Sequence, residues 1–568
     1  MSAPRLARLR RASQVIFFAL FLLHLFGTEF RGSLKAVNAD IRLPLPYPTI
    51  FLLSDPLIAV CNALASHALY RGLLWSLTIL IPTFFLGRFF CGWICPLGSL
   101  NHFFSSLKSE KKRGLRLIES NRYHSWQALK YYILTPLLVA SLLGGAVLTF
   151  ADPISLLFRS STLSVLPAIN VALSAWLGVL YKSGVPGLGF VADALRFLLQ
   201  TSLLSFRQPH FRQAFLVGLI FVSIMTLNLR VTRFWCRALC PLGALLGVVS
   251  RWSILGIEKK AADCDECKRC LLHCQGGDDP IPGAKWRKAE CHLCFNCVSD
   301  CPTAGIRFRF FPRDVGAALV AAQDGRAGHE GRPYVEIGPQ LQRRKLITAT
   351  AAGVALLPML RSSTAFSSEH NPRLIRPPGS LDESNFLARC VRCDACSKVC
   401  PNNSIQPAFT EAGWEGFWTP VLVPRVGYCE PSCTLCGQVC PTGAIWEITQ
   451  AEKAWLPASS KPDAKPVRIG TAFYDQGRCL PWSMATECIV CEEWCPTSPK
   501  AIYLVSATVV DSQGRPKQIR QPHVDPERCV GCGACEYACP VKDRAAVYVT
   551  SVGESRSEAN QILLRRMK

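Results

Sequence analysis

Cysteines are the residues best placed to do chemistry in this sequence, because all but one of the 29 fall into short, regularly spaced groups. Six groups hold four cysteines each, and a proline follows the last cysteine of every group except the first. These groups are Cys264, Cys267, Cys270 and Cys274; Cys291, Cys294, Cys297 and Cys301; Cys390, Cys393, Cys396 and Cys400; Cys429, Cys433, Cys436 and Cys440; Cys479, Cys488, Cys491 and Cys495; and Cys529, Cys532, Cys535 and Cys539. Sulfur ligands repeated in this way indicate metal binding.

The spacing within the groups is typical of iron–sulfur ligation. The run C-x2-C-x2-C-x3-C-P places three thiolates on one [4Fe–4S] cubane, and its fourth binds the neighbouring cubane where clusters are paired. Zinc prefers two C-x2-C pairs that lie further apart, and disulfides do not require this repeated spacing. We therefore predict six [4Fe–4S] clusters. Three groups depart from the ideal run: Gln275 follows Cys274, and the fourth and fifth groups have longer first gaps.

Two further pairs, Cys91/Cys95 and Cys236/Cys240, have the shorter pattern C-x3-C-P. A spacing of four residues places both thiols of a pair on one face of a helical turn. The four thiols could jointly bind another iron–sulfur cluster, act as redox dithiols, or shape a turn, and the sequence leaves these alternatives open. The remaining cysteine, Cys61, is predicted to be a buried apolar thiol.

The elements that carry these shorter pairs are predicted to be membrane helices. Hydrophobic residues make up 49% of the chain. Four apolar runs approach spanning length: Gln14–Phe26, Leu73–Phe90, Tyr131–Phe150 and Ala214–Leu229. Weaker stretches, which indicate re-entrant or interfacial pieces, lie at Thr49–Ala65, Val165–Leu180 and Leu188–Leu204. The expected fold class is a membrane α-helical domain of about four transmembrane helices, followed by α+β ferredoxin domains of the bacterial type.

The predicted membrane domain, residues 1–255, contains an internal repeat. Ser54-Asp55-Pro56-Leu57 matches Ala151-Asp152-Pro153-Ile154, and GRFFCGWICPLGSL at 87–100 matches TRFWCRALCPLGAL at 232–245. Two spans in each copy would give both copies the same orientation. A pseudo-twofold axis along the membrane normal would then bring the two cysteine pairs together.

Basic residues orient this domain. Arginines and lysines gather before the first predicted span, between the second and third, and after the fourth, so these segments and both C-x3-C-P pairs should face the cytoplasm. The net charge of +23 does not indicate nucleic-acid binding, because six cubanes with their thiolates carry about −12 and no basic–aromatic motif is present. A nucleotide-binding Rossmann fingerprint, a P-loop and a C-x-x-C-H haem motif are also absent from the sequence.

Three residues in the membrane domain are candidates for proton chemistry with a quinol: Asp55, Asp152 and His24. Carboxylates within membranes often mark proton paths. The alternative for both aspartates is helix N-capping, with proline at the first helical position. The alternative for His24 is a packed, hydrogen-bonded side chain.

The rest of the chain is predicted to form two iron–sulfur modules joined by a linker. Residues 256–312 have the size of a two-cluster ferredoxin and should be cytoplasmic. Residues 381–568 carry four groups, as in a polyferredoxin. The linker, 313–380, contains Arg343-Arg344 before a short apolar run, a pattern typical of a twin-arginine export signal. This internal signal or anchor would place the polyferredoxin in the periplasm; a surface helix or buried linker is the alternative.

These motifs resemble a known pair of families. Residues 1–312 resemble the NapH-type (MauN-like) membrane ferredoxin subunit, through FCGWICPLG, FWCRALCPLG and the two cluster groups that follow. Residues 342–548 resemble the NapG-type (MauM-like) ferredoxin, which normally carries its own twin-arginine signal and four [4Fe–4S] groups. The chain therefore resembles a fusion of the two, and this accounts for an export signal in the middle of a protein.

The resemblance implies a quinol dehydrogenase subunit of an anaerobic respiratory chain in the inner membrane. Electrons would pass from the membrane quinone pool through [4Fe–4S] clusters to a periplasmic partner such as a cytochrome or reductase. The alternative function is assembly or maturation of a metalloenzyme, in which the protein supplies electrons to a client. The terminal acceptor, the quinone and the pairing of the last four groups are left open by the sequence.

Overall fold

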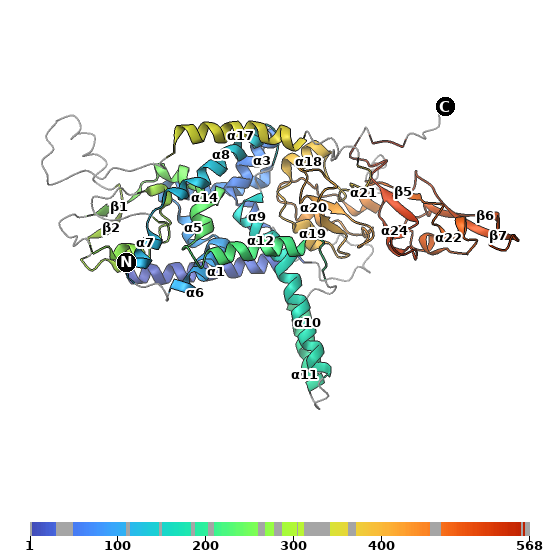
Figure 1. The fold of residues 1–568 in the computed structure, drawn as a ribbon, viewed down its shortest axis with the longest axis horizontal. Helices are drawn as coiled ribbons and strands as arrows, with labels where there is room; N and C mark the ends of the chain where they lie inside the picture. The colour runs from blue at the N-terminus through green and yellow to red at the C-terminus, as the bar shows by residue number, and fades with distance from the viewer. Residues whose placement is uncertain are drawn as a thin grey trace. The chain divides into compact units, whose positions relative to one another are not determined.

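The computed structural model describes residues 3–29, 49–109, 114–146, 150–182, 188–202, 209–259, 267–277, 287–303, 305–311, 341–361, 371–454, 467–557 and 560–562. Within them the chain divides into two compact units (Figure 1). The first unit comprises residues 1–23, 50–157 and 218–357, and the second comprises residues 24–49, 158–217 and 358–568. The prediction for Cys264 lies outside the described residues.

The first unit is mostly helical. Its helices, including those that continue into the second unit, are α1 (Ala3–Gly27), α2 (Ile50–Leu53), α3 (Pro56–Ser66), η1 (Arg71–Ser76), α4 (Leu77–Leu86), α5 (Phe89–Trp93), α6 (Pro96–Ser109), α7 (Leu115–Asn121), η2 (Ser125–Ala128), α8 (Leu129–Leu142), α9 (Pro153–Ser160), α12 (Ala214–Leu227), α13 (Phe234–Ala238), α14 (Pro241–Val249), η5 (Ser250–Trp252), η7 (Arg269–Leu271), η8 (Lys288–Glu290), α15 (Asn296–Asp300) and α17 (Arg343–Arg361). Prolines open α3, α9 and α14, where the missing N–H costs no intrahelical hydrogen bond.

The four predicted spans are not confirmed. Within the described residues, two helical stretches are long and apolar enough to cross a membrane, Arg5–Gly27 and Pro153–Lys182. The second stretch includes Val165–Leu180, which hydropathy alone ranks as weaker. Hydropathy does not show that this segment continues a helix that begins at Pro153 and passes through a π-turn at Ser161–Val165. The predicted run from Leu73 stops at Gly87 (φ 94°), and α12 is only 14 residues long.

The segment with the twin-arginine pattern forms a single helix, α17, which runs alongside α8 (Figure 1). Gly353 makes this possible, since a Cβ there would lie 2.7 Å from the Cα of Pro136. Leu357 is buried, whereas Arg343 and Arg344 are exposed. Among the described helices α17 is not one of the two with the length and hydropathy of a span.

A small ferredoxin module completes the first unit. Strands β1 (Leu255–Lys259) and β2 (Ile306–Phe310) pair antiparallel, with Ile257 opposite Phe308. Ile257, Leu271 and Ile306 form its apolar core with the cysteines of the first two groups. The core is small, so most of its interior is occupied by thiols, as expected where metal clusters replace apolar side chains.

The second unit contains two long helices and a larger α+β region. Its remaining elements are α10 (Leu166–Lys182), α11 (Leu188–Ser202), α18 (Glu383–Arg389), α19 (Ala395–Val399), β3 (Ile405–Pro407), β4 (Pro420–Leu422), α20 (Leu435–Gln438), α21 (Gln450–Ala454), β5 (Thr471–Tyr474), α22 (Leu480–Ser483), α23 (Val490–Glu493), β6 (Ile502–Val510), β7 (Pro516–Val524), α24 (Ala534–Ala538) and β8 (Val547–Thr550). Its described strands pair antiparallel in twos: β3 with β4, β5 with β8, and β6 with β7. Such short helices and two-stranded sheets are typical of bacterial ferredoxins.

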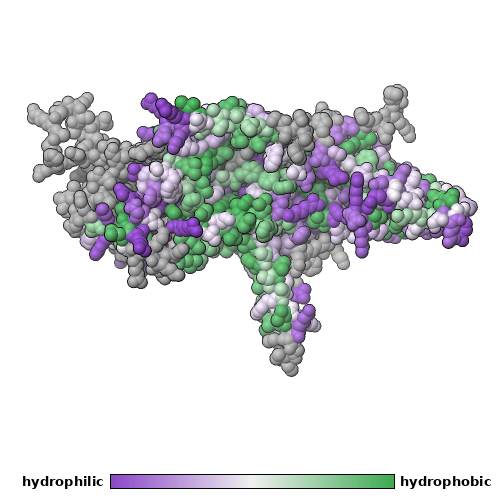
Figure 2. Space-filling view, in the orientation of Figure 1, coloured by the Kyte–Doolittle hydropathy of each residue, from purple (hydrophilic) through white to green (hydrophobic). Residues whose placement is uncertain are grey.

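The helix α10 displays apolar side chains at its surface (Figure 2). Trp176 is 50% exposed and Val179 is 69% exposed. Exposed apolar side chains along a helix of this length suit contact with lipid rather than water.

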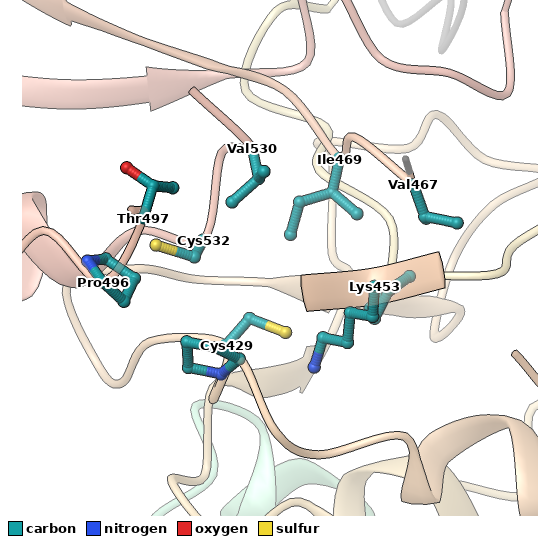
Figure 3. A pocket seen from close by; sticks show the side chains of 10 residues that line it. Cys429, Lys453, Val467, Ile469, Pro496, Thr497, Val530 and Cys532 are labelled. Atoms are coloured by element: carbon teal, nitrogen blue, oxygen red, sulfur yellow. The ribbon is translucent and has the colours of Figure 1, made fainter. Parts of the chain in front are cut away.

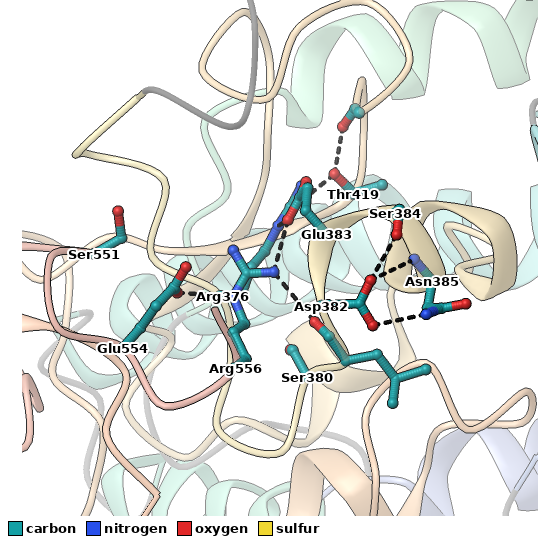
Figure 4. Close-up of polar contacts among 12 residues, drawn as sticks. Arg376, Ser380, Asp382, Glu383, Ser384, Asn385, Thr419, Ser551, Glu554 and Arg556 are labelled. Atoms are coloured by element: carbon teal, nitrogen blue, oxygen red, sulfur yellow. Dashed lines mark hydrogen bonds and ion pairs between the residues drawn. The ribbon is translucent and has the colours of Figure 1, made fainter. Parts of the chain in front are cut away.

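A buried ion network closes the α+β region of the second unit (Figure 4). Glu383 accepts from Arg376 Nη2 at 2.6 Å and from Arg556 Nη1 at 2.8 Å. Arg556 also pairs with Glu554 at 2.7 Å. The network therefore ties the C-terminal segment to the start of α18.

Candidate metal centres

One cavity in the second unit is lined by four cysteines from two different groups. It has a volume of about 330 Å³ and contains Cys479, Cys488 and Cys491 of the fifth group, together with Cys539 of the sixth. Tyr474 also lines it, and its hydroxyl lies 3.1 Å from the Cys491 sulfur. Three thiols from one run and the fourth from its neighbour are the ligand set of a paired cubane.

A second cavity of about 330 Å³ has the complementary set. The sixth group contributes three cysteines to it and the fifth contributes Cys495. The full set is Cys495, Cys529, Cys532 and Cys535. The fifth and sixth groups therefore exchange their last cysteines, and the nonstandard gap after Cys479 does not disturb this exchange.

The third and fourth groups exchange their last cysteines in the same way. Burial is the main cause that raises the pKa of the Cys393 and Cys396 thiols, and the thiol of Cys440 adds to it. Burial likewise raises the pKa of Cys433 to about 11, and here the thiol of Cys400 contributes. The pairing that the sequence leaves open is thus third with fourth and fifth with sixth.

The local backbone explains how the ideal runs form such tight loops. In three of these runs, the residues directly before and after the second cysteine both have left-handed backbone angles. This lets consecutive cysteines turn toward one centre. These residues are Leu293 and Phe295, Arg392 and Asp394, and Gly531 and Gly533. A short helix then carries the third cysteine, for example α19 and α24.

The two C-x3-C-P pairs meet inside the first unit. Cys91, Cys95, Cys236 and Cys240 are each less than 9% exposed. Burial, followed by the neighbouring thiols of Cys236, Cys91 and Cys95, raises the pKa of Cys240 well above its usual range. The internal repeat therefore does what its symmetry predicts, and gathers four thiols in one place.

Each of these four sulfurs receives a polar hydrogen. Backbone N–H groups of Gly98 and Gly243 donate to Cys95 at 3.3 Å and to Cys240 at 3.2 Å. Asn101 Nδ2 donates to Cys236 at 3.4 Å, and Arg88 Nη2 donates to Cys91 at 3.9 Å. Hydrogen bonds to sulfur are a usual feature of iron–sulfur sites, where they help to set the potential.

Two fully buried arginines stand beside these thiols at equivalent positions of the repeat, Arg88 and Arg233. Arg233 Nη1 donates to the carbonyl of Cys91 at 2.9 Å, and Arg88 Nη1 donates to the carbonyl of Ala289 at 2.6 Å. Buried cations need nearby negative charge. Glu290 Oε2 lies 3.8 Å from Arg88 Nη1, and four thiolates around a cluster would supply further negative charge beside both arginines, so the charges present fit such a group.

The ferredoxin module of the first unit is joined to this centre by buried polar contacts. Glu290, which precedes Cys291, accepts from Lys130 Nζ and from the Tyr131 hydroxyl. Trp93 Nε1 donates to the carbonyl of Leu293 at 3.0 Å. In the part of the chain that is described, the module's cysteines are buried or half-buried except Cys267, which is exposed.

Asp55 and Asp152 lie together in the first unit, both fully buried. Each caps a helix: Asp55 Oδ1 accepts from the N–H of Leu57 at 2.7 Å, and Asp152 Oδ2 accepts from the N–H of Ser155 at 2.7 Å. The two carboxyl groups are also within hydrogen-bonding contact of each other. Capping is therefore confirmed, and the repeat also makes the two caps a carboxyl pair.

The other sequence candidates occupy different places. His24 is half-buried near the end of α1 and belongs to the second unit. Cys61 is buried, as predicted, and its thiol contacts Ser141. Among the described residues no three His, Cys, Asp or Glu side chains converge closely enough for a single metal ion. A cubane spreads its thiolates over four irons, so wider cysteine sets suit it.

Comparisons with known proteins support 4Fe–4S binding in two parts of the chain. A family model described as a 4Fe-4S dicluster domain matches residues 485–542, which hold seven cysteines of the fifth and sixth groups but not Cys479. A second model, a 4Fe-4S binding domain, matches residues 68–116 and 211–258, which hold both C-x3-C-P pairs. No solved structure matches the chain.

Curated relatives decide the family. The methylamine utilization ferredoxin-type protein MauM of Methylorubrum extorquens is 35% identical over 216 residues, 36% of this chain and 88% of MauM. The chain belongs to the family of ferredoxin-type proteins. Ferredoxin-type protein NapG of Escherichia coli is 29% identical over 226 residues, 39% of this chain and 90% of NapG. NapF of the same organism is 33% identical over 180 residues, 31% of this chain and 85% of NapF.

As a ferredoxin-type protein, the chain is a 4Fe–4S electron-transfer protein, in agreement with the cysteine motifs. Sequence reasoning did not find the residues around the sulfurs: Arg88, Arg233, Glu290 and Lys453. The repeat offered a signal for the first two, since an arginine stands three residues before the first cysteine in both copies. Glu290 and Lys453 have no such signal, because only the fold brings them to the thiols.

Proposed function

We propose that this protein oxidises a membrane quinol and passes the electrons through its iron–sulfur centres to a redox partner in the periplasm. The observation that carries the proposal is the exchange of last cysteines between groups, which produces four-thiol sites in the C-terminal region. Bound [4Fe–4S] clusters supply one-electron chemistry, and the protein sets their position and potential.

Six such centres are proposed for the six cysteine groups. In the second unit each set combines three cysteines of one group with the last of its neighbour. The described thiols of the first unit surround a common core, which supports the same arrangement there. Closely packed centres let electrons pass singly from one to the next.

We further assign the C-x3-C-P thiols to an additional [4Fe–4S] site. Four buried sulfurs, four polar hydrogens aimed at them and two buried arginines support this assignment over free dithiols. Neutral free thiols would supply no negative charge to balance the buried Arg233, whereas Arg88 is also paired with Glu290 at 3.8 Å.

The carboxyl pair is the proposed proton acceptor. Quinol becomes quinone by losing two electrons and two protons; the electrons reduce two centres singly, and the protons leave through Asp55 and Asp152. Two carboxylates in contact away from water cannot both be charged, so the pair holds a proton between them. His24 is proposed as a quinol contact on the strength of its place in a predicted span.

The proposed partners follow from the family resemblance. The chain would join a NapH-type membrane subunit to a NapG-type ferredoxin, with the first ferredoxin module cytoplasmic and the polyferredoxin periplasmic. The partner would be a periplasmic cytochrome or reductase, and the quinone pool would be the donor. The membrane placement is supported by the two apolar helices, Arg5–Gly27 and Pro153–Lys182.

The proposal is tested by anaerobic reduction of the full-length protein in detergent with a quinol analogue. We expect bleaching of the iron–sulfur absorbance on a scale of seconds. The double variant Asp55→Asn/Asp152→Asn should slow it on the order of a hundredfold, since Asn retains the caps but cannot accept the protons.

Reduction with dithionite controls for intact clusters, and Asp382→Asn controls for loss of a capping carboxylate elsewhere, since Asp382 caps α18. Reduction by dithionite without any reduction by quinols would overturn the quinol proposal. In that case delivery of electrons to a client metalloenzyme becomes the function to test.

A further inference from the structure

A buried lysine lies among the thiols of the fourth cysteine group. Lys453 is carried by α21 and is 8% exposed. Its Nζ donates to the carbonyl of Glu430 at 2.6 Å and also to the carbonyl of Cys433. The groups that act most strongly on its ammonium are the thiols of Cys429, Cys433 and Cys436.

The ammonium is thus held inside the loop that carries these three cysteines. A hydrogen bond also joins it to the Cys429 sulfur, and Figure 3 shows the side chain pointing toward that residue. A positive charge next to sulfur ligands stabilises the reduced, more negative state of an iron–sulfur centre. In a buried site this effect is weakly screened by water.

The other centres of the second unit have a different charge environment. In the third group, burial raises the pKa of Cys390, and Arg392 and Arg376 lower it. Arg376 is paired with Glu383, however, and the buried carboxyl of Asp394 faces Cys393 and Cys396. In the sixth group, the half-buried Arg468 lowers the pKa that burial raises for Cys529. Tyr474, a neutral hydroxyl, faces the fifth group.

The fourth group also lies where the two cluster pairs meet. The N–H of Cys429 donates to the carbonyl of Cys532 at 2.8 Å. Cys429, Cys532 and Lys453 line one cavity of about 430 Å³ (Figure 3). A direct hydrogen bond therefore links a cysteine of one pair to a cysteine of the other at this junction.

We propose that Lys453 makes the centre held by Cys429, Cys433, Cys436 and Cys400 the most easily reduced of the four in the second unit, so that electrons collect at the junction. The proposal rests on the cluster ligation proposed above. Lys453 acts through its charge on the ligands, and is a tuning residue rather than a ligand.

The test is an EPR-monitored redox titration of the full-length protein, with mediators and dithionite instead of quinol. Lys453→Gln should shift the reduction equilibrium of one centre at least tenfold toward the oxidised form, which is 59 mV for one electron. Lys453→Arg should restore it to within about threefold of the native value. Lys517→Gln, the same charge change on the exposed strand β7, should shift no centre.

Iron and sulfide contents separate loss of a centre from a change of its potential. Unchanged potentials in a fully loaded Lys453→Gln protein would overturn the proposal. If that variant loses iron, the native protein provides the test instead. Electrons are added to it stepwise, beginning with less than one electron per molecule. Among the EPR signals that cysteine variants assign to the second unit, the first to appear must be one that Cys429→Ser lacks. If that first signal survives Cys429→Ser, the proposal is refuted.

Discussion

At the scale of single residues, the last cysteine of each run in the second unit belongs with the neighbouring run. Cys400 lies with the fourth group and Cys440 with the third, whereas the chain order suggests the reverse. The consequence is that a cysteine's place in the sequence does not identify the centre that it serves.

This arrangement predicts an exchanged pattern of mutational losses. Cys400→Ser should perturb the same EPR signal as Cys433→Ser, and Cys440→Ser should perturb the same signal as Cys393→Ser. The reason is that each serine replaces one ligand of a shared set. EPR spectra of the four variants at matched iron content provide the measurement, and identical effects of Cys400→Ser and Cys393→Ser would contradict the exchange.

The residue types show how far sequence reasoning reaches. The cysteine spacing predicted the kind of cofactor, because a tight loop of thiolates depends on local chain geometry. The charges beside the sulfurs were not predictable in the same way. Lys453 reaches Cys429 only through the packing of α21, and Glu290 reaches Lys130 only when the ferredoxin module folds onto α8.

At the scale of elements, the close contact between α17 and α8 depends on Gly353. Gly353→Leu would push a side chain into the backbone of Pro136, so we expect α17 to detach and become a better protease substrate. Limited trypsin digestion at Arg361 should accelerate by at least about tenfold. Ala352→Leu, at an exposed position of the same helix, should leave the rate unchanged.

Equal digestion rates for the two leucine variants would show that the contact of Gly353 with α8 does not hold α17 in place.

The ion network around Glu383 is a second element-scale feature. Burial works to raise the pKa of Glu383, but Arg376 and Arg556 outweigh it and lower this pKa. A lowered folded-state pKa contributes stability above about pH 4.3, and that contribution is lost as the pH falls further. Glu383→Gln at neutral pH should therefore destabilise the region by about 3–5 kcal/mol, since two arginines lose a buried partner.

The measurement is the urea concentration at which the visible iron–sulfur absorbance disappears. Glu527→Gln, at an exposed position, is the matched control and should not change it. A midpoint for Glu383→Gln equal to that of the control would show that the network does not stabilise the fold.

Helix lengths explain why the predicted spans were incomplete. Hydropathy counted apolar residues through Gly87, where a positive φ ends the helix, and undervalued Val165–Leu180, which continues a helix begun at Pro153. A helix end at a glycine and a helix that continues through a π-turn are both set by backbone geometry, which hydropathy does not report.

At the scale of the whole molecule, the location of the two ferredoxin regions decides the proposed direction of electron flow. In intact spheroplasts we expect added protease to cut the 381–568 region and to spare the 256–312 region. The physical reason is that α17 begins with the twin-arginine pattern Arg343-Arg344 and lies between the two regions in the sequence. Immunoblotting with an antibody to each region provides the measurement.

Protection of both regions until the membrane is broken would place every centre in the cytoplasm and would contradict the periplasmic partner. Digestion of both regions in broken cells is the control that each region contains accessible cleavage sites.

The exchange of last cysteines also bears on how the protein is made. A site begun at Cys479 is complete only when the ribosome has passed Cys539, and one begun at Cys390 must wait for Cys440. Metal insertion would then proceed by pairs rather than by single centres, after most of each pair has been synthesised. A chain that is truncated before Cys539 would leave an open site, which gives cellular quality control a direct way to recognise an unfinished copy.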